Sequence, residues 1–108
     1  MNKKINYVVA WHIRQFVKKE LIDYTKNKKM LERYQGNTRE LIIAYKRINQ
    51  IETVLEQLNE ADREAFDIIF VDQYTVVGAE IARGLGRGAY YNAMNKIIYL
   101  VAKEMELI

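Results

Sequence analysis

The sequence predicts an all-α fold, a small helical domain, and three observations lead to that prediction. Apolar residues recur at intervals of three and four along most of the chain, which is the period of a helix with one buried face. No segment alternates apolar and polar residues for long enough to form a convincing strand. The 108 residues include no proline, the residue that interrupts helices, and this length suits one domain.

The composition excludes several classes of function. The chain has no cysteine, which rules out disulfides, thiolate metal sites and cysteine nucleophiles. Apolar runs are only a few residues long and the N-terminus shows no export signal, so we expect no membrane partner and a cytoplasmic location. No nucleophile, base and orienting group occur at a recognisable spacing. We therefore expect neither an enzyme nor a bound metal or cofactor.

The first expected helix covers residues 5–24 and runs for about five turns. Its apolar stripe consists of Ile5, Val8, Val9, His12, Ile13, Phe16, Val17, Leu21 and Tyr24. The charged segment 26–29 interrupts this pattern, which resumes at Met30 and ends before residues 35–37. Because the stripe includes the only histidine, we expect His12 at the core or its edge rather than at a ligand site.

A second helix is expected over residues 38–58. Asn37, followed three residues later by Glu40, has the form of an N-terminal capping box. The apolar positions then follow a heptad spacing, at Leu41, Ala44, Ile48, Ile51, Leu55 and Leu58. Such a seam can pack against the first helix or against a second copy of the chain. A regulator that reads a two-fold DNA site would gain from the second arrangement, so we expect a homodimer.

The remaining region, 59–108, is expected to fold with region 1–58 as one cooperative domain. Asn59 is the predicted cap of a helix with an acidic first turn, and Thr75 is the predicted cap of the next. The apolar face between them contains Ala65, Phe66, Ile69, Phe70 and Tyr74. Four carboxylates, Asp62, Glu64, Asp67 and Asp72, lack the spacing of a calcium loop. We expect them on a solvated helix face.

Residues 75–102 have the pattern of a helix-turn-helix, two helices joined by a glycine-rich turn. Ala82 is the predicted small residue at the helix crossing, flanked by core contacts from Ile81 and Leu85, and Gly86 is the predicted turn residue. The second helix should point five residues to the core, namely Tyr90, Met94, Ile97, Ile98 and Val101. The glycines of 84–88 lack the βαβ context of a nucleotide loop and are interpreted as a flexible turn.

A DNA-reading surface is predicted on the other faces of that second helix. Its residues are Arg87, Tyr91, Asn92, Asn95 and Lys96, with Arg83 on the DNA backbone. Asparagine suits the task because its amide both donates to and accepts from adenine. Charge counts against strong binding by this region alone, since residues 1–57 hold 12 Lys/Arg against 6 Asp/Glu and residues 58–108 hold 5 against 8.

The eight tyrosines are an alternative nucleic-acid signal, because aromatic side chains can stack on single strands. Six of them fall mostly on the expected apolar stripes, namely Tyr24, Tyr34, Tyr45, Tyr74, Tyr90 and Tyr99. We expect those six to pack at core edges. Tyr91 is the exception, because Tyr90 already occupies the inward position.

Two stretches resemble phage late-gene transcription regulators of the ArpU/RinA type. The first is 13–33, with Glu-Leu-x-x-Tyr at residues 20–24, a Lys-rich turn and a second helix. The second is 51–102, with Leu58, Arg63, Glu64, the Ile-Ala-x-x-Leu-Gly scaffold and the paired tyrosines 90–91. The resemblance implies a C-terminal part similar to region four of sigma factors and double-stranded DNA as the partner. It also raises host RNA polymerase in a bacterial cell as a partner, without deciding that contact.

The chain departs from this group at the turn and at the helix that follows. The turn is shorter by about two residues and has no hydroxyl cap, and the helix lacks the usual basic cluster after the tyrosines. Two functions remain open. One is a sequence-specific DNA-binding transcription regulator of phage or prophage late genes. The other is a helical interaction or assembly protein in which the helix-turn-helix is only a packing motif.

Overall fold

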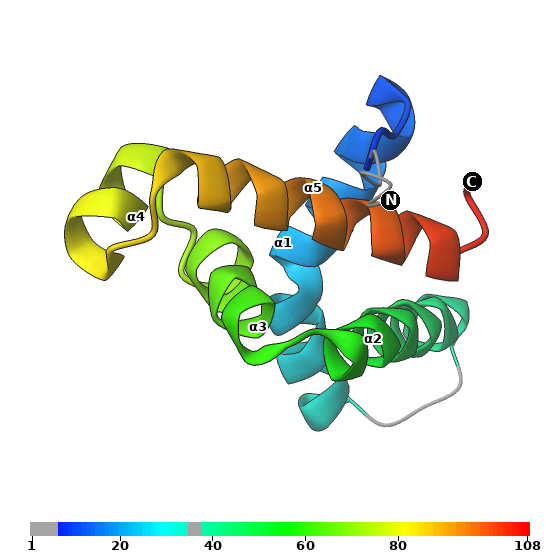
Figure 1. Cartoon of the computed structure of the whole chain (residues 1–108). Helices are drawn as coiled ribbons and strands as arrows, with labels where there is room; N and C mark the ends of the chain where they lie inside the picture. Colours follow the sequence, from blue (N-terminus) through cyan, green and yellow to red (C-terminus); the bar gives the residue numbers. More distant parts are fainter. Residues whose placement is uncertain (1–6, 35–37) are drawn as a thin grey trace.

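The computed structural model describes residues 7–34 and 38–108, and all regular structure in these two ranges is helical. The elements are α1 (Trp11–Arg33), α2 (Arg39–Gln57), α3 (Glu60–Phe66), the π-helical turn η1 (Asp67–Val71), α4 (Val76–Arg83) and α5 (Arg87–Glu104). Figure 1 shows their course. The all-α prediction is confirmed over the described residues, which contain no strand.

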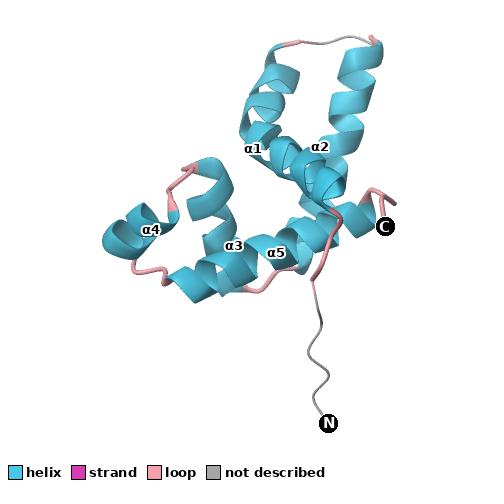
Figure 2. Ribbon diagram, turned by 90° about the horizontal axis from the view of Figure 1, so that it is seen from above, coloured by secondary structure: helices cyan, strands magenta, loops and turns pink. Residues whose placement is uncertain are grey.

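The helices form two neighbouring parts that share α5. Figure 2 shows α1 and α2 side by side as a hairpin, while α4 lies at the opposite end of the molecule. The long helix α5 packs against α1, α2, α3 and α4. The short helix α4 packs on η1 and on α5. This arrangement gives an elongated body of 47 × 33 × 25 Å with α4 and the start of α5 at one end.

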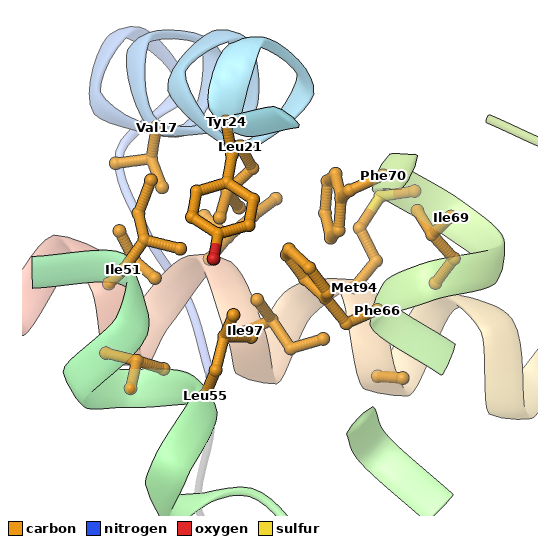
Figure 3. Close-up of a cluster of buried hydrophobic side chains, with 14 of the residues drawn as sticks. Val17, Leu21, Tyr24, Ile51, Leu55, Phe66, Ile69, Phe70, Met94 and Ile97 are labelled. Carbon is orange, nitrogen blue, oxygen red and sulfur yellow. The ribbon is translucent and has the colours of Figure 1, made fainter. Parts of the chain in front are cut away.

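One hydrophobic core joins the two halves of the sequence. Tyr24 from α1 meets Phe66 at the end of α3 edge to face, with 5.9 Å between the ring centroids. Figure 3 shows Ile51 of α2 and Ile97 of α5 in the same cluster. Regions 1–58 and 59–108 therefore share buried contacts rather than burying separate cores.

Side-chain caps set the starts of three helices. The Asn59 side chain accepts a hydrogen bond from the Asp62 amide at 2.8 Å, and Thr75 accepts one from the Gly78 amide at 3.0 Å, so both predicted caps are confirmed. The predicted start of the second helix is wrong by one residue. Thr38 caps α2, its hydroxyl accepting from the Leu41 amide at 3.4 Å, whereas Asn37 lies outside the described residues.

Helix α1 differs from its prediction at both ends. It begins at Trp11, continues through the charged segment 26–29 and ends at Arg33, so the expected turn there is wrong. Lysine is a good helix former, and a polar segment can continue a helix whose outer face is in water. His12 is exposed, not at the core edge, and its neighbour Ile13 takes the position that packs against the core. Ile5 lies outside the described residues.

The heptad seam of α2 packs inside the chain. Five of its six residues are buried and Leu58 is half-buried, and Val54, which the heptad pattern omits, is buried as well. Helix α2 contacts α1 and α5 along this face. The intramolecular alternative is therefore the one observed, and the seam is not free for a second copy. Tyr34 and Tyr45, expected at core edges, are exposed.

Candidate nucleic-acid interface

The candidate interface consists of α4, a three-residue turn and α5. The turn glycine is Gly84, whose φ of 69° lies in the left-handed region that glycine adopts without steric cost. The Gly84 amide donates to the carbonyls of Ala79 and Glu80, and the Leu85 amide donates to the Ala79 carbonyl at 3.2 Å. Gly86, the predicted turn residue, instead precedes α5 with an ordinary φ of −63°. The short glycine-containing turn fits a helix-turn-helix connection.

The helix crossing uses a different small residue from the predicted one. Ala79 is completely buried where α4 packs on α5 and η1, whereas Ala82 is exposed and Ile81 is 82% exposed. Ala79 and Ile81 are two positions apart and so lie on opposite sides of the helix, and the packing that turns Ala79 inward leaves Ile81 outward. The prediction that Ile81 and Ala82 form the crossing is therefore wrong. Leu85 is half-buried and packs against the core, as expected.

Two glycine substitutions should change stability in opposite directions. Gly84→Ala is expected to destabilise the chain by about 1 kcal/mol, because a Cβ is disfavoured at positive φ even though the surrounding space is open. Gly88→Ala is the matched control in the first turn of α5, where a Cβ also meets nothing within 4 Å. It should stabilise by about 0.5–1 kcal/mol through helix propensity. Urea unfolding midpoints check both values, and equal shifts of one sign would contradict the assignment of the turn.

Helix α5 presents its inner face as predicted. Tyr90, Met94, Ile97, Ile98 and Val101 are all buried. The Tyr90 hydroxyl donates to the Tyr74 carbonyl at 2.8 Å, which ties α5 to the segment just before α4. Burial, aided by the neighbouring Tyr91, raises the pKa of Tyr90 above its ordinary value. The orientation of α5 is thus set by packing along almost its whole length.

Three of the six predicted DNA-contacting residues are exposed together at the start of α5. Arg87 and Asn92 are exposed, and Tyr91 is 40% exposed, as the sequence predicts for the tyrosine not facing the core. The Arg87 guanidinium lies over the Tyr91 ring, 5.9 Å from its centroid. The ring lies edge to face against Tyr90, 5.5 Å away. Arg87, Tyr91 and Asn92 are named here the α5 tip.

Asn95 and Lys96 are occupied by contacts within the chain. The Arg14 guanidinium of α1 donates to the Asn95 Oδ1 at 2.6 Å. Lys96 Nζ lies 2.6 Å from Asp62 Oδ2 in an ion pair between α5 and α3. This hydrogen bond raises the pKa of the Lys96 ammonium, against a smaller desolvation effect. Asp62 is therefore half-buried and paired, not on a fully solvated face.

Arg83, the predicted backbone contact, lies at the end of α4 between two carboxylates. Its guanidinium nitrogens are 3.5 Å from Asp72 and 4.0 Å from Glu64. Ion pairs on the surface contribute little to the stability of a protein. Arg83 can therefore exchange a carboxylate partner for a phosphate at little cost in free energy. The sequence missed Arg14 and Asp62 as partners of the predicted site. Arg14 is 81 residues from Asn95, and no local pattern reports such a contact.

Two features are absent from the residues that the structure describes. They contain no group of three or more His, Cys, Asp or Glu side chains placed to hold a metal ion. Within the same residues, no helix is long and apolar enough to cross a membrane. No family model, no curated protein and no solved structure matches this chain.

Proposed function

We propose that this protein is a sequence-specific DNA-binding transcription regulator that reads duplex DNA with the α5 tip. The observation that carries the proposal is the joint exposure of Arg87, Tyr91 and Asn92 directly after the short turn at Gly84. A DNA-binding helix-turn-helix places the start of its second helix in the major groove. Packing of the rest of α5 fixes the backbone that carries these three side chains, which limits the ordering that binding requires.

The three side chains of the α5 tip suit different contacts with DNA. Arg87 can donate two hydrogen bonds to guanine, and Asn92 can pair with adenine through its amide. The Tyr91 ring supports the guanidinium of Arg87, and its hydroxyl suits a phosphate oxygen. Arg83 serves the DNA backbone by leaving its surface carboxylates. Asn95 and Lys96 take secondary roles in this proposal because Arg14 and Asp62 already hold them.

The resemblance to phage late-gene regulators extends the proposal to phage or prophage late-gene control. It brings with it the likeness to sigma-factor region four and contact with host RNA polymerase. Of the scaffold part of that resemblance, Leu85 and Gly86 lie in the turn, whereas Ile81 and Ala82 are exposed and do not form the crossing. The continuous α1 departs from the N-terminal part, which implied two helices.

Selection of bound sequences from a random duplex pool, followed by footprinting, tests the function and names the site. Asn92→Ala is expected to relax preference at one base pair and to cost about 1–3 kcal/mol on the selected site. Lys103→Ala is the matched control, an exposed residue in the last turn of the same helix, and should leave the preference unchanged. Unaltered sequence preference in an Arg87→Ala, Asn92→Ala double variant would overturn the assignment of the α5 tip.

A second function, self-assembly through helices, is favoured by one observation. The outer face of α2 exposes Ile42 and Ile43, at 57% and 48%, with Tyr45 beside them. A homodimer, if it forms, uses such an exposed surface, because the heptad seam is buried. Light scattering of the wild type against Ile42→Asp, Ile43→Asp tests it. A concentration-dependent dimer lost in the variant supports assembly, and a monomer in both excludes this face.

A further inference from the structure

A basic groove lies between the second half of α1 and the segment before α4. It encloses about 510 Å³ and is lined by Ile22, Thr25, Lys26, Lys29, Met30, Arg33, Tyr34, Val71 and Gln73. Three of these residues are cations and none is Asp or Glu. Their spacing of three and four places the cations on one side of α1.

The three cations of the groove are free to meet an external anion. Among the described residues, none of Lys26, Lys29 and Arg33 takes part in an ion pair within 4.0 Å, and all three are exposed. Lys28 on the same helix differs, because it pairs with Glu52 at 3.4 Å. Three like charges on neighbouring turns repel one another, which a bound polyanion relieves.

The groove also offers neutral donors and an apolar floor. The Thr25 hydroxyl, the Gln73 amide and the Tyr34 hydroxyl are the kinds of group that contact phosphate oxygens alongside Lys and Arg. Ile22 and Met30 provide apolar surface between the cations. Gln73 has a φ of 54°, a conformation that non-glycine residues rarely adopt. The backbone thus accepts strain at the residue that forms the far wall of the groove.

One wall of the groove, at Gln73, lies near the turn that precedes the α5 tip. Gln73 is two residues before Thr75, the cap of α4, and α4 has eight residues. These segments together span roughly 20 Å at most from Gln73 to the turn, from the reach of the chain and the helical rise. One helical turn of DNA is longer, at about 34 Å.

We propose that this groove binds the phosphate backbone of duplex DNA as a second contact, separate from the α5 tip. The inference rests on the proposed function and deepens it. The groove supplies affinity for any sequence, while the α5 tip supplies preference. It also accounts for the location of the positive charge, which lies in the N-terminal half and away from the helix-turn-helix.

The test compares two charge-matched variants on a duplex of about two helical turns that contains the selected site. The groove variant is Lys26→Gln, Lys29→Gln, Arg33→Gln. The control variant is Arg39→Gln, Lys46→Gln, Arg63→Gln, which removes three exposed cations outside the groove. Circular dichroism confirms that both are folded. Affinity is measured between about 50 and about 200 mM salt.

The groove variant should keep the selected sequence preference and show a weaker salt dependence. Release of counterions from three phosphates contributes a slope of about 0.9 each, so raising the salt should weaken its binding by a factor about 40-fold smaller than for the wild type. The control variant should change this factor several-fold less. In the wild type, amide signals of residues 25–34 should shift on addition of the duplex, a readout that needs no substitution.

The outcomes separate this inference from the proposed function. A groove variant with the wild-type salt dependence, or equal losses in both variants, overturns the groove while the α5 tip stands. Unshifted amides at residues 25–34 in a bound complex have the same meaning. A wild type that binds no duplex overturns both proposals.

Discussion

Ile48→Asp together with Ile51→Asp should unfold the chain. Both side chains are buried on the α2 face that packs against α1 and α5, at 5% and 1% exposure. An unpaired carboxylate in such a place costs several kcal/mol, and a domain of this size is stable by only about 5–15 kcal/mol in total. Far-UV circular dichroism should show loss of most of the helix signal at neutral pH.

The matched control is the double substitution Ile42→Asp, Ile43→Asp on the outer face of the same helix. It introduces the same two charges where the side chains are already exposed, so the helix signal and the unfolding midpoint should change little. The Ile48→Asp, Ile51→Asp variant distinguishes a seam buried within one chain from a seam between two chains. A dimeric wild type that becomes a folded monomer through Ile48→Asp, Ile51→Asp would contradict the packing of α2.

Phe66→Ala should lower the free energy of unfolding by about 3–5 kcal/mol, the usual cost of removing a buried aromatic ring. Phe66 is only 1% exposed and contacts Tyr24 from the N-terminal half and Phe70 from η1. Because this ring contacts residues from both halves of the sequence, the loss of stability should be detected in both halves. Hydrogen exchange of amides in α1 and α5 should accelerate by a similar factor.

Phe16→Ala is the control for ring size. Phe16 is 38% exposed at the edge of the α1–α2 contact, where the Arg47 guanidinium of α2 lies 5.1 Å from its centroid. Its removal should cost only about 1 kcal/mol, the scale of an exposed cation–π contact with some packing. Faster exchange confined to one half of the Phe66→Ala variant would show two separately folding regions instead of one cooperative domain.

Helix α5 could be predicted from the sequence because its evidence is local. Its inward residues recur at the helical period, so a reader of the sequence can assign Tyr90 inward and Tyr91 and Asn92 outward without knowing what covers them. The caps Asn59 and Thr75 were predictable for the same reason, since each depends on a contact with an amide three residues away. The all-α fold follows from the same periodicity.

The short α4 could not be placed in this way. Eight residues give barely two turns, too few for the apolar period to show whether Ala79 or Ala82 faces the crossing. Gly84, Gly86 and Gly88 are equally plausible turn residues in a sequence, and only the positive φ of Gly84 distinguishes them. Here the sequence predicted two helices joined by a glycine-containing turn but not the inner face of the first helix.

By itself the sequence determined that the chain is helical, where most helices lie and which side of α5 faces the core, because local periodicity and caps encode these properties. Only the tertiary structure decided what fills each face. It placed the α2 seam against α1 and α5, tied Asn95 and Lys96 to Arg14 and Asp62, and opened a groove beside Lys26, Lys29 and Arg33. The physical reason is that such partners are far apart in sequence. The residues near an apolar stripe or a charged side chain do not specify its tertiary partner.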